Sequence, residues 1–113
     1  GGSNIIKLRG RSSFQSPAYN AVKMIEAAMG GEKFTLPAGC YVNCDKCGFK
    51  NVMMAMPTTI DKTGVHFTEP AGTEEEMASL AKSYEHLCKM RDEIVELGIV
   101  PAVEKWNELN PNL

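Results

Sequence analysis

Two short stretches of this sequence carry side chains that could do chemistry: a polar loop at residues 10–18 and a cysteine cluster at residues 40–47. The loop presents one guanidinium and two hydroxyl groups, from Arg11, Ser12 and Ser13. A guanidinium can bind a carboxylate through two parallel hydrogen bonds, and a hydroxyl group can donate to a ligand oxygen. The loop is therefore a candidate site for a small acid, although the two serines could equally form turn hydrogen bonds alone.

The polar loop leads directly into a predicted helix. Ser16 suits the N-cap position, and Pro17 suits the first helical position after it. Apolar or small residues then recur at intervals of three and four as far as Gly30, which predicts a helix over residues 17–29. Its predicted apolar face consists of Ala18, Ala21, Val22, Ile25, Ala28 and Met29. A loop held by such a helix is positioned firmly enough to contact a ligand.

The cysteine cluster offers a different chemistry. Cys40, Cys44 and Cys47 have the spacing C-x3-C-x2-C, and residues 44–48 resemble a zinc knuckle, in which two thiolates reach one ion. A structural zinc ion generally has four ligands; Cys88 and the two histidines are available, but no second C-x2-C exists. We therefore expect no metal, with Cys40 packed in a strand and the other two as reduced thiols in a hairpin loop. A small zinc-binding module using Cys40, Cys44 and Cys47 remains an alternative.

Neither histidine is a strong candidate for acid–base catalysis. His66 lies in a predicted strand whose alternation places it on the exposed side, and His86 lies off the apolar face of a long predicted helix. Neither has an acidic residue at a spacing that indicates an orienting partner. We expect no catalytic residue in this chain.

The surrounding elements predict an α+β fold, with antiparallel strands packed against a long C-terminal helix and an N-terminal helix pair. Strands are expected near residues 34–42, 50–60 and 65–68, with a hairpin turn at residues 61–64. The long helix is predicted over residues 73–97, because Thr73 and Glu76 form a capping box and Gly98 ends it. Its apolar face is broken only by Arg91 and otherwise contains Met77, Leu80, Ala81, Tyr84, Leu87, Cys88, Ile94, Val95 and Leu97. The tail after Pro101 has a weak helical pattern, and we expect Trp106 to pin it to the body.

Composition narrows the class of protein. The chain has 113 residues, a mass of 12.4 kDa and a net charge of −2, so it is one domain at most, with a modest core. Basic residues are scattered among the acidic ones and do not alternate with aromatic residues, which argues against nucleic-acid binding. With no long apolar stretch and no signal peptide, we expect no membrane partner and a cytoplasmic location.

The order of the motifs resembles the C-terminal part of the catalytic domain in the lactate and malate dehydrogenase family. The resemblance extends to about residue 97 and rests on Gly1-Gly2, Ile5-Ile6-Lys7-Leu8, the loop from Gly10 to Ala18, Leu36-Pro37, Met56-Pro57-Thr58-Thr59-Ile60 and Thr63-Gly64-Val65. The Ser-Pro-Ala ending of the loop favours the malate type. The chain departs from the family at Arg11, Phe14 and Gln15, where the residues are usually small, aromatic or apolar.

The resemblance implies that Ser12 and Ser13 line a substrate pocket and that Pro17 packs on the nicotinamide ring of NAD. It places the catalytic histidine and the substrate-binding arginines upstream of this region, and the sequence contains no Gly-x-Gly-x-x-Gly cradle for a dinucleotide. We therefore expect residues 1–113 to be the C-terminal part of the substrate domain of an NAD-dependent malate dehydrogenase, inactive alone.

The expected partners are the missing dinucleotide-binding domain, a small 2-oxo or 2-hydroxy dicarboxylic acid, and further copies in a homo-oligomer. That assembly is expected because an apolar helix face without its partner domain would be exposed. A stand-alone interaction domain that uses the long helix is a third possibility.

Overall fold

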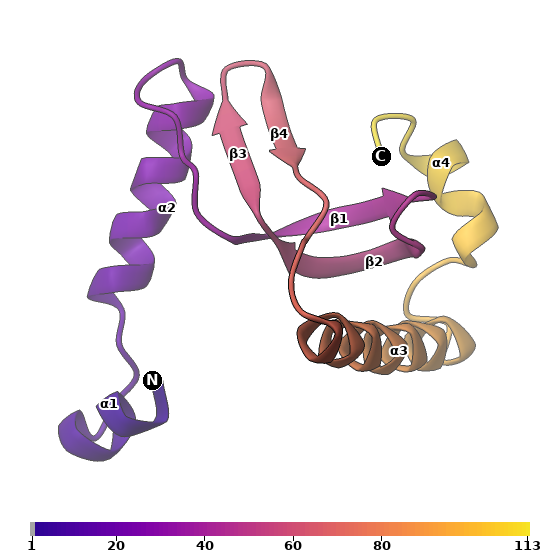
Figure 1. Ribbon diagram of the computed structural model, residues 1–113, viewed down its shortest axis with the longest axis horizontal. Helices are drawn as coiled ribbons and strands as arrows, with labels where there is room; N and C mark the ends of the chain where they lie inside the picture. Colours follow the sequence, from indigo (N-terminus) through magenta and orange to yellow (C-terminus); the bar gives the residue numbers. More distant parts are fainter. Residues whose placement is uncertain (1) are drawn as a thin grey trace. The chain divides into compact units, whose positions relative to one another are not determined.

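A computed structural model describes residues 2–113 and has an α+β architecture, as expected (Figure 1). The elements in chain order are α1 (Gly2–Arg9), α2 (Gln15–Ala28), β1 (Ala38–Cys44), β2 (Phe49–Met56), β3 (Thr58–Asp61), β4 (Gly64–Phe67), α3 (Glu74–Glu96), the 3-10 helix η1 (Val103–Lys105) and α4 (Trp106–Leu109). The chain forms two compact units. One comprises the chain up to Leu36 with Thr58–His66, and the other comprises Pro37–Pro57 with Phe67–Leu113.

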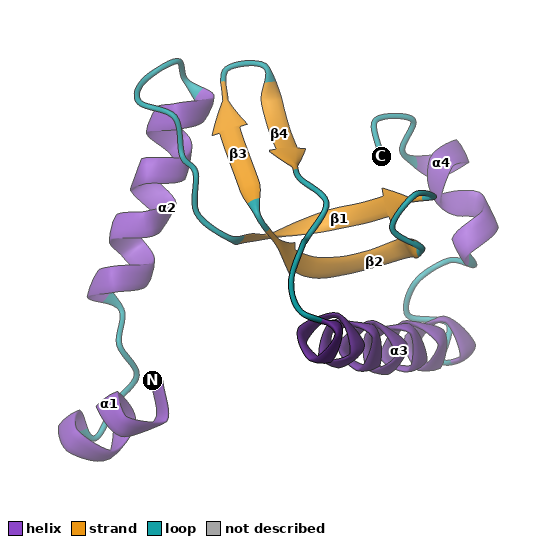
Figure 2. Cartoon of the chain, in the orientation of Figure 1, coloured by secondary structure: helices purple, strands orange, loops and turns teal. Residues whose placement is uncertain are grey.

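The second unit is built on the antiparallel hairpin of β1 and β2. Alternation along the two strands places one set of side chains on the side that packs against α3, and the register pairs Cys40 with Met54 and Val42 with Val52. The buried core consists of Cys40, Val42, Phe49, Val52, Met54 and Met56. Figure 2 shows α3 running along this hairpin.

The long helix confirms its prediction closely. The side chain of Thr73 accepts from the Glu76 N–H, and the Glu76 carboxylate accepts from the Thr73 N–H, which completes the capping box. Half-buried residues on α3 follow the predicted face: Met77, Leu80, Ala81, Tyr84, Leu87, Cys88 and Val95. Ile94 and Leu97 were also expected on that face but are 39% and 73% exposed.

Two predicted strands begin or end elsewhere. The expected strand over residues 50–60 is divided at Pro57 into β2 and β3, which belong to different sheets. Proline has no N–H to donate to a strand ladder, so the ladder of β2 stops before Pro57. The Pro57 carbonyl accepts from the N–H of Thr68, which follows β4. The expected strand from residue 34 starts only at Ala38, because Phe34 forms an isolated bridge with Ile60.

In the first unit α2 packs against β3, and the predicted apolar face of α2 is not the face that packs. Ala27 is fully buried, while Val22 is 56%, Ile25 59% and Met29 83% exposed. The residues that share the packed side of α2 with Ala27 are Asn20, Lys23 and Met24. The packed side of α2 therefore combines one small, two polar and one large apolar residue, while Val22, Ile25 and Met29 are exposed.

The C-terminal tail is helical and attached to the second unit as expected. The Trp106 indole N–H donates to the Pro101 carbonyl at 2.8 Å, and the Trp106 ring lies 6.3 Å from the ring of Tyr41 on β1. Within residues 2–113, every helix is too short or too polar to cross a membrane.

Candidate functional site

The polar loop lies between α1 and α2, and α2 begins earlier than predicted. Gln15 is its first residue and Phe14 occupies the N-cap position without a side-chain hydrogen bond, so Ser16 is not the N-cap. Pro17 falls at the third helical position, where its missing N–H removes no helical bond because the first four N–H groups have no partner in the helix. The first helical hydrogen bond runs from the Ala18 N–H to the Phe14 carbonyl at 3.0 Å.

The three residues assigned to a ligand site lie together at this end of α2. Ser12 and Pro17 are exposed, and Ser13 is half-buried. Among residues 2–113, no group forms a hydrogen bond with either serine hydroxyl. The two hydroxyl groups therefore do not form the side-chain turn hydrogen bonds that were the structural alternative, and they remain available to a ligand.

Two arginines flank the aromatic ring in the same loop. The guanidinium carbon of Arg11 lies 5.3 Å from the centre of the Phe14 ring, and that of Arg9 lies 5.9 Å from it. Arg9 also donates to the Gln15 side-chain oxygen at 3.3 Å. The sequence contains no acidic residue before Glu26, and neither guanidinium forms an ion pair within the described part of the chain. Phe14 thus gathers two unpaired positive charges in the loop that also carries Ser12 and Ser13, and such charges favour the binding of an anion.

His66 has partners that sequence spacing did not reveal. Its Nε2 lies 2.8 Å from the Thr63 hydroxyl and 3.7 Å from an Asp61 carboxylate oxygen. The expectation that no acidic residue orients this histidine was therefore wrong, because the tight turn between β3 and β4 brings residues 61 and 66 side by side. Hydrogen bonds from the Thr63 hydroxyl and backbone N–H also hold the pKa of Asp61 below its ordinary value. Asp61, Thr63 and His66 thus form an exposed hydrogen-bonded cluster at this turn, in which the Asp61 carboxylate is stabilised as an anion.

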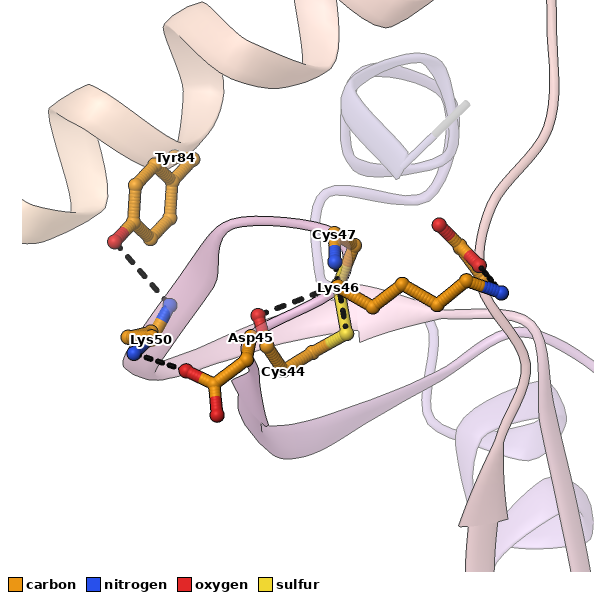
Figure 3. Close-up of a disulfide and its surroundings, with 7 residues drawn as sticks. Cys44, Asp45, Lys46, Cys47, Lys50 and Tyr84 are labelled. Atoms are coloured by element: carbon orange, nitrogen blue, oxygen red, sulfur yellow. Dashed lines mark hydrogen bonds and ion pairs between the residues drawn. A yellow bond between two sulfur atoms is a disulfide. The ribbon is translucent and has the colours of Figure 1, made fainter.

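The cysteine loop differs from expectation in its oxidation state. Cys44 and Cys47 form a disulfide, whereas we expected free thiols (Figure 3). The turn after β1 brings their Cα atoms to 5.6 Å, inside the range that a disulfide spans. Cys40 is buried in β1 as predicted. Within residues 2–113, no three side chains of the metal-binding types converge, so the zinc alternative lacks a ligand set.

Arg91 is a polar residue whose role the sequence did not reveal. Its Nη1 donates to the carbonyl oxygens of Lys50 and Asn51, at 3.3 and 3.1 Å. Asn51 accepts in turn from the Tyr41 hydroxyl at 2.6 Å. Tyr41, Asn51 and Arg91 line a mainly apolar cavity of about 280 Å³, together with Trp106. The sequence held one indication of this role, because Arg91 alone interrupts the apolar face of the predicted helix. A charged side chain on a packed face requires hydrogen-bond acceptors in the element that it faces.

Comparison with known proteins places these features in a family. Residues 1–97 match the model of the lactate/malate dehydrogenase alpha/beta C-terminal domain. The chain belongs to the lactate/malate dehydrogenase family. The malate dehydrogenase of Geobacillus kaustophilus is 36% identical over 87 residues, which cover 75% of this chain and 28% of that protein.

Other relatives carry the same name. The malate dehydrogenase of Sorangium cellulosum is 34% identical over 74% of this chain and 26% of its own length, and that of Anoxybacillus flavithermus is 34% identical over 75% and 28%. The matches therefore span little more than a quarter of these relatives. The family assignment agrees with the resemblance drawn from the sequence motifs, including its malate type.

Proposed function

We propose that this chain forms one wall of the substrate pocket in an NAD-dependent malate dehydrogenase that interconverts malate and oxaloacetate. The observation that carries the proposal is the combination of family membership with the loop before α2, in which Arg11, without an ion pair, is followed by Ser12 and Ser13, whose hydroxyl groups form no hydrogen bond within residues 2–113. A dicarboxylic acid offers the carboxylates that a guanidinium binds and oxygens that accept from hydroxyl groups.

In this proposal the residues of the loop bind and orient the substrate. Arg11 pairs with a substrate carboxylate, while Ser12 and Ser13 donate to substrate oxygens. The proton transfer and the binding of the other carboxylate belong to residues outside this chain, as does the dinucleotide-binding domain. A cytoplasmic location is part of the same proposal.

The fit of NAD to these residues is partial. Pro17 is exposed on the first turn of α2 and offers an apolar surface of the kind that packs on a nicotinamide ring. The sequence has no glycine-rich loop that could hold the phosphates. Bound NAD would accept or supply the hydride. This chain would contribute one apolar contact to it and exclude water from one side.

A chimaera tests the proposal. The 87-residue segment of Geobacillus kaustophilus malate dehydrogenase that matches this chain is replaced by the corresponding segment of this chain. We expect the chimaera to reduce oxaloacetate with NADH and the isolated chain to show no turnover. A folded chimaera without activity, or one that prefers pyruvate, would contradict the proposed reaction.

Variants of the chimaera then test the individual residues. Arg11→Met and Ser13→Val should each raise the KM for oxaloacetate by about tenfold, which corresponds to about 1.4 kcal/mol of lost binding. Ser79→Ala, on the exposed side of α3, is the matched control and should leave KM unchanged. An active chimaera that tolerates both loop substitutions would disprove the pocket assignment while leaving the reaction intact.

A further inference from the structure

The disulfide in the turn between β1 and β2 has no part in the proposed substrate pocket. We propose that Cys44 and Cys47 form a reversible thiol–disulfide exchange site, which reacts with low-molecular-weight thiols and with their disulfides. Both side chains are half-buried rather than enclosed, and they lie at the tip of the hairpin (Figure 3). Both residues also pack against the buried core, so the proposal requires a small thiol to reach the sulfur atoms from the solvent side of the turn.

The two sulfur atoms have different surroundings. The backbone N–H of Cys47 points to the Sγ atom of Cys44, with a distance of 3.1 Å between N and Sγ. An N–H donor stabilises negative charge on the sulfur that it faces, so Cys44 is the better leaving group when the disulfide opens. The incoming thiolate is therefore expected to attack the Sγ atom of Cys47.

The exchange proceeds in two balanced steps. A small thiolate attacks Sγ of Cys47, the bond between the two cysteine sulfurs breaks, and its electron pair stays on Cys44 as a thiolate. A second small thiolate attacks the small-thiol sulfur of the mixed disulfide and leaves Cys47 as a thiolate. The pair has then gained two electrons, and the two small thiols, oxidised to one disulfide, have given up two protons that the cysteines can take. The reverse reaction consumes that small disulfide.

Contacts other than the disulfide hold the turn in place. The Gly48 N–H donates to the Cys44 carbonyl at 3.1 Å, and Gly48 has a φ of +77°, which suits glycine. Ion pairs join Asp45 to Lys50 and, at 3.1 Å, Lys46 to Glu69. The reduced turn therefore keeps its two thiols close together. Reclosure is then intramolecular and needs no rearrangement of the strands.

The other two cysteines are poorly placed to compete. Cys40 is only 6% exposed, and its sulfur faces the Met54 carbonyl inside the core. Cys88 is half-buried on α3 and has no disulfide partner. The two-electron couple should therefore be confined to the Cys44 and Cys47 pair.

The first test uses the unmodified full chain. The protein is equilibrated in buffers of reduced and oxidised glutathione, quenched with acid and alkylated, and the state of each cysteine is read by peptide mass spectrometry. We expect the Cys44 and Cys47 pair to interconvert as a two-electron couple under native conditions while Cys40 stays a thiol. A pair that is reduced only after denaturation, or that does not reclose with oxidised glutathione, would overturn the proposal.

The second test distinguishes the two sulfurs. Cys47→Ser leaves Cys44 as a single thiol and keeps the backbone N–H at position 47, whereas Cys44→Ser leaves Cys47 without that donor. The midpoint pH for reaction with iodoacetamide should be about one unit lower for Cys44 than for Cys47. Cys88→Ser is the control that keeps the pair, and circular dichroism checks the fold of each variant. Equal or reversed midpoints would disprove the assigned roles.

Discussion

The guanidinium of Arg91 on α3 donates to the carbonyl oxygen of Asn51. Among residues 2–113, Asn51 is the one residue other than glycine that has a positive φ. The backbone of β2 is left-handed at Asn51, with a φ of 55°. At the same place the carbonyl oxygens of Lys50 and Asn51 both accept from Arg91. Arg91 therefore fixes the start of β2 to the long helix by polar contacts, as does the Tyr84 hydroxyl, which accepts from the Lys50 N–H.

Replacing Arg91 should destabilise the protein measurably. Arg91→Met keeps most of the side-chain volume but leaves the carbonyls of Lys50 and Asn51 without this donor, at a cost of about 1–3 kcal/mol. Urea unfolding measured by circular dichroism gives the free energy. Lys89→Met, at an exposed position of the same helix, should change it by less than about 0.5 kcal/mol. Equal effects would show that the Arg91 contacts contribute nothing.

Position 51 should prefer glycine to a β-branched residue, unlike an ordinary strand position. Asn51→Val places a branched side chain at a left-handed φ and should be less stable than Asn51→Gly by about 1–2 kcal/mol. Both variants lose the bond from Tyr41, so that term cancels in the comparison. At Ala55, which is exposed on β2 and regularly paired with Gly39, the order of the valine and glycine variants should reverse because valine favours strands. Thermal unfolding of the four variants measures both differences.

The capping box contributes to the stability of the start of α3. Thr73→Ala removes the acceptor for the Glu76 N–H and should lower the free energy of unfolding by about 1 kcal/mol. Ser79→Ala, one turn further along on the exposed side, is the control and should have a much smaller effect. Hydrogen exchange should also show faster opening of the first turn in Thr73→Ala, and an unchanged first turn would contradict this role.

The turn at Asp61 should make stability depend on pH in acid. Hydrogen bonds from Thr63 lower the pKa of the Asp61 carboxyl in the folded state, so its stabilising contribution is present above its ordinary value of 3.8. That contribution is lost as the pH falls below 3.8 and through the lowered pKa. The difference in unfolding free energy between the wild type and Asp61→Asn should therefore shrink from pH 6 to pH 3. A difference that stays constant over this range would disprove the linkage.

The outward face of α2 should promote self-association. Val22 and Ile25 are more than half exposed and Met29 almost fully, and a contiguous exposed apolar patch favours association. We propose that a partner domain or a second copy covers this face in the assembled protein. Val22→Glu together with Ile25→Glu should shift the isolated chain toward monomer in sedimentation velocity, and Val65→Glu on β4 should not. The wild-type chain sedimenting as a monomer at high concentration would contradict the prediction.

A second apolar segment could also carry the association. Ile6 is 47% and Leu8 87% exposed on α1, while Ile5 is half-buried. Ile5→Glu combined with Ile6→Glu should favour monomer if this segment is the contact. Comparison with the α2 variants shows which helix is responsible.

Local signals predicted the parts of the fold that depend on local physics. The capping box, the period of α3 and the glycine turn at residue 64 each specify one element, and each is present. The two faces of α2 could not be distinguished in this way, because which face packs depends on β3, a strand far along the chain. Pro57 was a readable signal for a strand break, since proline lacks the donor that a continuing ladder requires.

The candidate site was predictable through motif order rather than through chemistry. The serines of the loop carry no distinctive spacing; their hydroxyl groups made them candidates, and only the resemblance to the family assigned them to a substrate pocket. The pairing of Cys44 with Cys47 and the partners of Arg91 depend on distances that a sequence does not contain. From the sequence alone, the spacing of the cysteines is equally compatible with a metal site. An arginine on an apolar helix face is likewise compatible with a surface position.

The division of the chain into two units has a consequence for biosynthesis. The first unit needs β3 and β4, so its N-terminal helices cannot complete their packing until Thr58–His66 has left the ribosome. By then the whole β1 and β2 hairpin has also left the ribosome, while its covering helix α3 has not yet emerged. A nascent chain in which Thr58–His66 has left the ribosome while α3 is still inside it would thus hold a complete first unit and an uncovered hairpin. This is the stage at which this polypeptide is most exposed to aggregation or to a chaperone.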